Sequence, residues 1–307
     1  MKTIFIALAA FAATLPAIGQ TGNPTAPATV PRTVDLNVLV LDRDHHPVTE
    51  LTNSAFTITE DGAPRTIQTV AAAEGPVSLC LLIDESGSTN GERGPIGEAA
   101  AALVKDLPAG SEVMVVRFSN AAYLDLPFTP ASSVDPEKLT TLTSRGGTAM
   151  FDALVKAEIN LLANAHQKRR AMVLITDGGD NASRLSGEQA MQRLIRSGAP
   201  FLYALSVPGK TEYREDISRD SDRLKKLFKI AGGIVLRAKN PNDLSPLVDE
   251  ISEMIRSQYV LSFLPENIPD GTMHKLEAKI NQLDKRDEIQ TLSGFYYWGP
   301  RPQTTAK

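Results

Sequence analysis

Cysteine is almost absent from the sequence of 307 residues. Cys80 is its only cysteine, so no intramolecular disulfide can form, even in an oxidising compartment. None of the four histidines has a cysteine at a zinc-ligand spacing, and the sequence therefore gives no support for a transition-metal site. Cys80 itself lies in the apolar run VSLCLLI, which predicts a buried free thiol.

An excess of positive charge is also missing. The chain has 32 Lys and Arg against 36 Asp and Glu, a formal net charge of -4, and this balance gives no electrostatic case for a nucleic-acid partner. No GK[ST] sequence follows a strand and no G-x-S-x-G frame is present, so the common phosphate-binding loop and the common serine-hydrolase turn are both excluded.

A long hydrophobic run is lacking as well. The N-terminal run IFIALAAFAATLPAI follows Lys2, contains Pro16 and is shorter than the roughly 20 residues that cross a bilayer as a helix. This pattern predicts a signal peptide over residues 1–19, with a retained membrane anchor as the alternative. We expect an exported protein, periplasmic or extracellular, without stable membrane insertion. Residues 20–32 are expected to be a flexible linker and residues 300–307 a disordered tail.

Between residues 76 and 257, short apolar strands alternate with amphipathic helices. The strands are VSLCLLI, EVMVVRF, AMVLIT, PFLYALSV and GIVLRA, with AYLDL as an expected edge strand. The intervening segments carry apolar residues at helical spacing, as in the set Leu244, Leu247, Val248, Ile251, Met254 and Ile255. This order predicts an α/β fold, a doubly wound and mainly parallel sheet with helices on both faces.

Alternating strands flank this domain on both sides. Residues 33–73 contain strand patterns and the turn signal Asp61-Gly62, and residues 258–299 contain a further alternating strand at Leu276, Ala278 and Ile280. Neither segment is long enough to build its own core. We therefore expect the N-terminal and C-terminal segments to pair as one small β module.

Three polar clusters follow strands or precede a helix in the α/β domain: DESGS, SRGGT and TDGGDN. In an open parallel sheet, ligands bind at the carboxyl ends of the strands, where these clusters are expected. Their oxygen-bearing side chains suit Mg²⁺, with Mn²⁺ or Ca²⁺ as alternatives. The candidate ligands are Asp84, Ser86, Ser88, Thr148 and Asp177. Taken singly, each of these residues is equally typical of a helix cap or a turn.

The combination of the three clusters resembles the metal-ion-dependent adhesion site of the von Willebrand factor type A family. All five positions match that motif, which implies a cation held by these residues and completed by an acidic side chain of a partner. The flanking segments VDLNVLVLDRDHHPV and QYVLSFLPENIPDG also look like the related secreted proteins of acidobacteria and other bacteria. The resemblance further implies that the last helix, expected over residues 242–257, moves on ligand binding; a rigid packing helix is the alternative.

These observations predict an exported, metal-dependent binding or adhesion module that captures a protein or peptide offering a carboxylate. It is not expected to be an enzyme. The alternatives are a Mg²⁺-dependent hydrolase of phosphate esters and a structural domain that binds no metal. Glu85 and Asp180, beside the candidate ligands, either add charge and hydrogen bonds to the site or are solvated loop residues.

Overall fold

A computed structural model describes residues 33–42, 44, 46–72, 74–143, 145–167, 169–197, 200–208, 214–240, 243–265, 272–281, 288–291 and 295–298. The expected signal peptide, linker and C-terminal tail lie outside these residues. Within the described part of the chain, no helix is long and apolar enough to cross a membrane.

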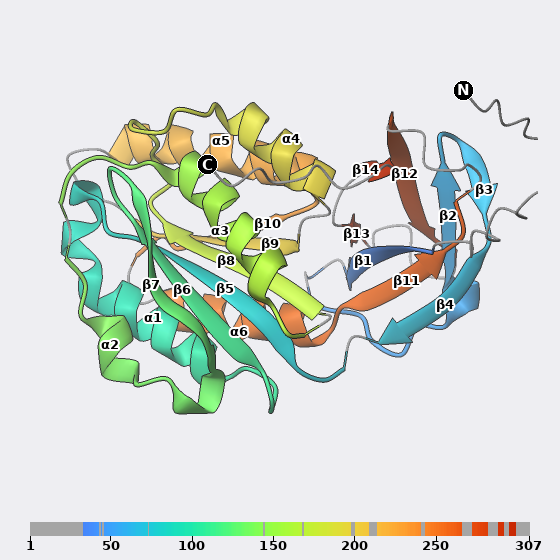
Figure 1. Ribbon diagram of the computed structural model, residues 1–307, viewed down its shortest axis with the longest axis horizontal. Helices are drawn as coiled ribbons and strands as arrows, with labels where there is room; N and C mark the ends of the chain where they lie inside the picture. The colour runs from blue at the N-terminus through green and yellow to red at the C-terminus, as the bar shows by residue number, and fades with distance from the viewer. Residues whose placement is uncertain are drawn as a thin grey trace, which may run out of the picture. The chain divides into compact units, whose positions relative to one another are not determined.

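The centre of the fold is a six-stranded sheet with the order β10-β9-β8-β5-β6-β7 (Figure 1). Its strands are β5 (Val77–Asp84), β6 (Glu112–Phe118), β7 (Ala122–Pro130), β8 (Arg169–Thr176), β9 (Phe201–Ser206) and β10 (Ile234–Arg237). All neighbours pair in parallel except β7, which is antiparallel to β6 at one edge. The chain passes from β5 to β6 on one side and returns to β8 on the other. The carboxyl end of β5 is therefore the switch point at which this class of sheet binds ligands.

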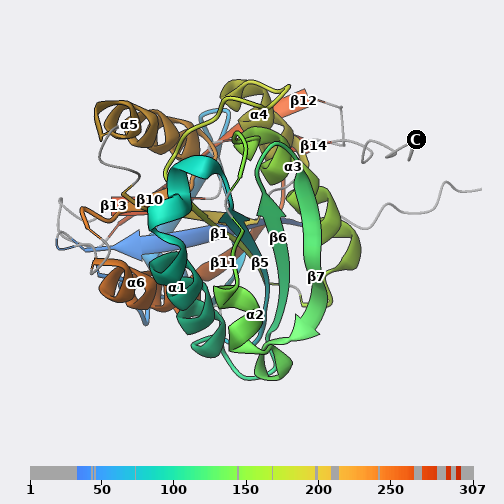
Figure 2. The same ribbon diagram turned by 90° about the vertical axis from the view of Figure 1, so that its left-hand side faces the viewer.

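Helices cover both faces of this sheet, as predicted, because alternate residues of the central strand point to opposite faces. Cys80 and Leu82 belong to the apolar cluster that includes residues of α3 (Met150–Asn164), α4 (Gly187–Ser197) and α5 (Arg214–Ile230). Leu79, Leu81 and Ile83 belong to the cluster that includes α1 (Arg93–Lys105), α2 (Pro136–Thr140) and α6 (Leu244–Arg256). Figure 2 shows α1 and α2 beside β5, β6 and β7.

Local side-chain and backbone features mark the ends of three helices. Ser186 and Gln189 form a capping box at the start of α4, in which each side chain accepts from the other residue's backbone N–H, at 3.2 and 2.9 Å. Helix α5 ends before Gly232, whose φ of +69° suits glycine. The short α2 was not predicted, although Asp135 caps it by accepting from the Glu137 N–H at 3.0 Å.

The N-terminal and C-terminal segments pair with each other, as predicted. One sheet has the order β13-β1-β11-β4 and the other β14-β12-β2-β3. Their strands are β1 (Val34–Leu41), β2 (Phe56–Glu60), β3 (Ala63–Arg65), β4 (Ile67–Ala72), β11 (Tyr259–Phe263), β12 (Thr272–Ile280), β13 (Glu288–Thr291) and β14 (Phe295–Trp298).

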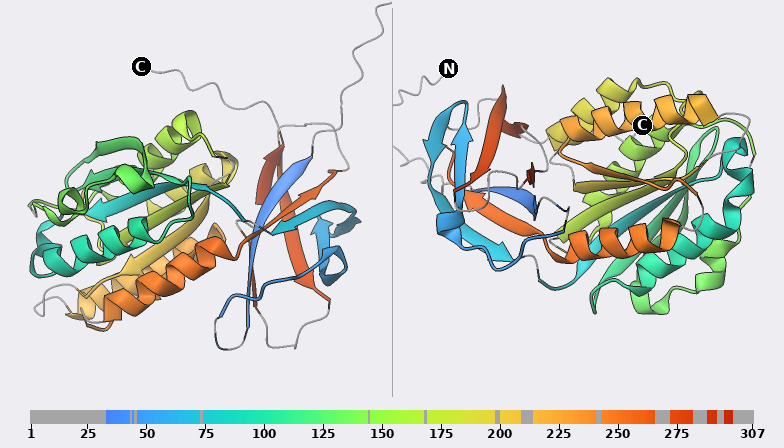
Figure 3. Two further views of the ribbon diagram at one scale, coloured as in Figure 1. Left: turned by 90° about the horizontal axis from the view of Figure 1, so that it is seen from below. Right: turned by 180° about the vertical axis from the view of Figure 1, so that it is seen from behind.

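Antiparallel registers join the two ends of the chain in both sheets, with Leu36 opposite Leu261 in one and Ile58 opposite Ala278 in the other. In Figure 3 the blue N-terminal strands lie beside the orange C-terminal strands. Residues more than 200 positions apart therefore build one β module. Three short 3₁₀ turns complete the described elements: Asn53–Ala55, Gly87–Gly91 and Ala131–Ser133.

Candidate metal site

The three polar clusters meet at the carboxyl ends of β5 and β8. The Gly87 N–H donates to the Gly146 carbonyl at 3.1 Å, which joins the loop after β5 to the loop before α3. The Thr148 N–H donates to Asn181 Oδ1 at 2.8 Å, and the Asn181 N–H donates to the Thr148 carbonyl at 3.0 Å. These bonds join the loop before α3 to the loop after β8, so segments up to 97 positions apart form one site.

Glycine is required where two of these loops approach each other. A Cβ on Gly87 would lie 3.3 Å from the Gly146 carbonyl oxygen, and Gly146 has a φ of +79°. Gly147 donates its N–H to Asn120 Oδ1 at 2.7 Å, and a Cβ there would clash with the Asn181 side chain. The pair of glycines before Thr148 therefore allows the backbone contact that places Thr148.

Asp84 ends β5 and is fully buried, with 0% of its surface exposed. Its Oδ1 accepts the Ser86 N–H at 2.8 Å, and its Oδ2 accepts the Thr176 hydroxyl at 2.6 Å. The first bond turns the chain directly after the strand. The second comes from the neighbouring strand β8 and fixes the plane of the carboxylate.

The hydroxyl groups of Ser86 and Ser88 lie together, with 3.0 Å between their Oγ atoms. Ser86 is buried and Ser88 is half-buried. Thr89 stabilises the turn that contains both serines, because its hydroxyl donates to the Ser86 carbonyl at 3.0 Å. Thr148, the fourth candidate, is buried at the start of α3.

Asp177 is 2% exposed, and it follows β8 directly. Its Oδ1 accepts the Gly179 N–H at 3.2 Å, whereas its Oδ2 is buried and has no hydrogen-bond partner among the residues that the structure describes. Buried carboxylate oxygens are costly unless a hydrogen bond or a cation compensates them. Asp177 Oδ2 is therefore an acceptor that the described part of the chain leaves unsatisfied.

The two aspartates also act on each other electrostatically. Burial raises the pKa of Asp84, the nearby Asp177 carboxylate raises it further, and hydrogen bonds from Thr176 and Ser86 oppose the change. Neither aspartate has a basic partner among the residues that the structure describes. Two buried carboxylates without a counter-charge fit a divalent cation, which would offset the repulsion.

The donor set further limits which metal fits. The described residues contain no group of three or more His, Cys, Asp or Glu side chains that could hold a metal. A cation here would rely on two carboxylates and on hydroxyls. Such hard oxygen donors suit Mg²⁺, Mn²⁺ or Ca²⁺ better than a softer transition metal.

Glu85 and Asp180, the two acidic neighbours, are not solvated loop residues. Glu85 is 3% exposed, and its carboxylate bonds to Arg117 and Tyr123. Asp180 Oδ2 accepts the Phe151 N–H at 3.0 Å, so it caps the first turn of α3. Both residues support the loops.

Sequence reasoning missed Thr176 and Asn181 as supporting residues. Thr176 donates to Asp84, and Asn181 accepts from the Thr148 backbone. Each has a polar side chain next to a candidate cluster, but the sequence alone does not indicate which strand or loop it would reach.

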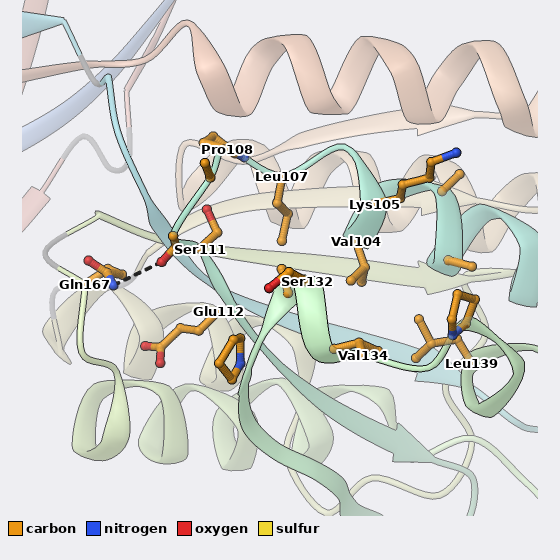
Figure 4. Close-up of a pocket in the computed structure, with 17 residues that line it drawn as sticks. Val104, Lys105, Leu107, Pro108, Ser111, Glu112, Ser132, Val134, Leu139 and Gln167 are labelled. Atoms are coloured by element: carbon orange, nitrogen blue, oxygen red, sulfur yellow. Dashed lines mark hydrogen bonds between the residues drawn. The ribbon is translucent and has the colours of Figure 1, made fainter.

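A separate cavity of about 680 Å³ lies at the opposite, amino-terminal end of β6 (Figure 4). Apolar side chains including Val104, Leu107, Val134 and Leu139 line it, with Glu112 and Gln167 at one side. The Glu112 carboxylate already accepts from Ser78 and His166. None of the five candidate ligands lines this cavity.

Comparisons with known proteins address the fold. The family model of the von Willebrand factor type A domain matches residues 79–179. No curated protein matches the sequence. A solved von Willebrand factor type A protein from Catenulispora acidiphila is 15% identical with a TM-score of 0.51, covering 87% of this chain and 74% of its own.

Two further solved structures have lower TM-scores. The D319A mutant of the PilB minor pilin from Streptococcus sanguinis is 15% identical with a TM-score of 0.49, over 60% of this chain and 62% of its own. BatB from Bacteroides thetaiotaomicron is 20% identical with a TM-score of 0.40, over 59% of this chain and 100% of its own. Residues 79–179 therefore match the von Willebrand factor type A family, and the sheet that contains them has the fold of a von Willebrand factor type A domain.

Proposed function

We propose that this protein is an exported binding module that captures a carboxylate-bearing protein or peptide through a divalent cation. The single observation that carries the proposal is the buried, unpartnered Oδ2 of Asp177 close to the buried carboxylate of Asp84. This pair would stabilise the fold better with a cation than without one. Domains of the von Willebrand factor type A class often act in adhesion or protein binding, which agrees with the proposal.

The residues that would hold the cation are Asp84, Ser86, Ser88, Thr148 and Asp177. A bound Mg²⁺, Mn²⁺ or Ca²⁺ would supply positive charge and a coordination position for an incoming carboxylate. The protein supplies the arrangement: Thr176 orients Asp84, Thr89 holds the serine turn and Asn181 holds the Thr148 backbone. Such supporting hydrogen bonds commonly change metal affinity 10- to 100-fold, on the order seen in other metal sites.

Thermal unfolding tests metal binding. Ligand at about 100 times its Kd stabilises the folded state by about 2.7 kcal/mol, so Mg²⁺ should raise the Tm of the wild type by several degrees. Asp84→Ala should lose most of that shift, whereas Glu98→Gln, an exposed change on α1, should keep it. Equal shifts in the wild type and Asp84→Ala would remove the metal hypothesis.

Crosslinking capture in the native envelope tests the partner. We expect capture to fall when a chelator is added and to fall equally in Asp177→Ala. Capture that is indifferent to both changes would place the recognition surface elsewhere. Hydrolysis of phosphate esters that survives purification and disappears in Asp177→Ala would instead make the protein an enzyme.

A further inference from the structure

One residue inside the candidate metal loop is anchored at several points although it is not a candidate ligand. Glu85 lies between Asp84 and Ser86. Its N–H donates to the Phe118 carbonyl at 2.8 Å, and its carbonyl accepts the Arg145 N–H at 2.9 Å. The backbone between two candidate ligands is therefore fixed from both sides.

The Glu85 side chain turns into the protein and is bonded there. Its Oε1 accepts from Arg117 Nη1 at 2.8 Å and from the Thr143 N–H at 3.1 Å. Its Oε2 accepts the Tyr123 hydroxyl at 2.7 Å. These three donors satisfy both oxygens of the carboxylate, which compensates for the cost of burying it.

Arg117 is anchored in its turn to elements outside the loop. Its Nε donates to Asp125 Oδ2 on β7 at 2.7 Å, and its other bonds reach two carbonyls of the α2 region, those of Lys138 at 2.5 Å and Thr141 at 2.8 Å. Burial opposes its charge, but the carboxylates of Glu85 and Asp125 outweigh this and raise the pKa of Arg117. The guanidinium is therefore a permanent cation that joins the loop to β7 and α2.

The geometry of this network is particular to arginine. A planar guanidinium donates in several fixed directions at once, whereas a lysine ammonium is a point charge on a flexible stem and cannot reach both carboxylates and both carbonyls. A function limited to fold stability would need no connection to the metal loop. Here the more buried of the two Arg117 ion pairs ends on Glu85, the residue between two candidate ligands.

We infer that Arg117 and Glu85 are positioning residues that hold the loop of Asp84, Ser86 and Ser88 in its cation-binding arrangement. This inference rests on the proposed function. Arg117 touches none of the five candidate ligands through any hydrogen bond described above, so its effect on the cation must pass through Glu85.

Calorimetric titration of the full-length protein with Mn²⁺ and Mg²⁺ tests this path. Arg117→Lys and Glu85→Gln should each weaken metal binding by about 10-fold, the order found when supporting residues of metal sites are changed. In the double variant the loss should remain about 10-fold rather than reach about 100-fold, because both changes break one path. Losses that multiply would mean that Arg117 acts on metal binding by a path other than Glu85 and would overturn the inference.

Two further variants separate positioning from general weakening. Asp125→Asn removes the negative charge of one partner of Arg117 but leaves the Glu85 bond, so it should lower the Tm and keep the metal Kd within about 2-fold. Tyr123→Phe removes one donor to Glu85 at a side chain that is 44% exposed, which protects the fold from damage. A small loss of affinity is expected for Tyr123→Phe. An affinity loss in Asp125→Asn as large as that in Arg117→Lys would contradict the inference.

Hydrogen exchange of the metal-free protein gives a result that does not depend on the proposed function. The amides of Ser86, Gly87 and Thr89 are bonded within the loop and to Gly146, and they should exchange faster in Arg117→Lys than in the wild type. Unchanged exchange would overturn the positioning inference. Absence of metal binding by the wild type would overturn the proposed function. Faster exchange in Arg117→Lys would still support the inference that Arg117 and Glu85 position the loop of Asp84, Ser86 and Ser88.

Discussion

Replacing Glu158 by glutamine should change how the stability of this protein depends on pH. Glu158 lies on α3, is 2% exposed and accepts a hydrogen bond from the Ser197 hydroxyl of α4. Burial raises the pKa of Glu158 from 4.5 to about 7, and the Ser197 bond opposes the rise only in part. The carboxyl group is therefore neutral in the folded protein at a pH where it is already ionised in the unfolded chain.

The sign and size of the effect follow from this difference. The stabilisation of the folded state by the neutral Glu158 carboxyl group is fully present below about pH 4.5 and is lost as the pH rises through about 7. One pKa unit corresponds to about 1.4 kcal/mol, so the free energy of unfolding should fall by about 3 kcal/mol across this range. Glutamine cannot ionise and still accepts from Ser197, so Glu158→Gln should lack this loss.

Urea unfolding at intervals between pH 4.5 and pH 8.5 measures the effect. The difference in free energy of unfolding between wild type and Glu158→Gln should change by about 3 kcal/mol in favour of the variant. Glu98→Gln, on an exposed face of α1, is the matched control and should run parallel to the wild type. Parallel curves for wild type and Glu158→Gln would refute the reasoning.

Three other expectations concern packing, the β module and the free thiol. Gly97→Ala should destabilise the fold by about 1–3 kcal/mol, because its Cβ would lie 2.6 Å from the Thr140 Cα. Gly94→Ala on the same helix has no atom within 4 Å of the new Cβ and should stabilise by up to about 1 kcal/mol in urea unfolding. Tyr259→Phe should cost about 1–2 kcal/mol, since its hydroxyl bonds two backbone groups of the loop after β1; a cost near zero would contradict this. Burial raises the pKa of Cys80, so a thiol reagent at pH 8 should label it only after unfolding, and rapid labelling of the native protein would disprove its burial.

Most of the α/β architecture could be predicted because its signals are local. Apolar runs such as VSLCLLI are buried along their whole length, and helices such as α6 show one apolar face, so strand and helix follow from residue spacing. The short α2 escaped prediction because five residues are too few to show a helical period. The β strands were foreseen, but their partners depend on contacts between the two ends of the chain.

The candidate site divides in the same way. The residue types and spacing of Asp84, Ser86, Ser88, Thr148 and Asp177 already indicate oxygen ligands and the family motif, and their function in binding a cation stays a prediction. Glu85 shows what the sequence could not decide. Its neighbours in sequence are compatible both with a residue that adds charge and hydrogen bonds to the site and with a solvated loop residue. Its burial and its bond to Arg117 are visible only once β6 is placed beside β5.

The sequence by itself therefore determined the alternation of strands and helices, the buried Cys80 and the identity of the candidate ligands, since each depends on residues close along the chain. The tertiary structure alone decided that Thr176 donates to Asp84, that Asp177 keeps an oxygen with no partner among the described residues, and that Arg117 pairs with Glu85. These contacts join residues 32 to 93 positions apart. Such distances are closed by packing and strand register, which local residue preferences do not encode.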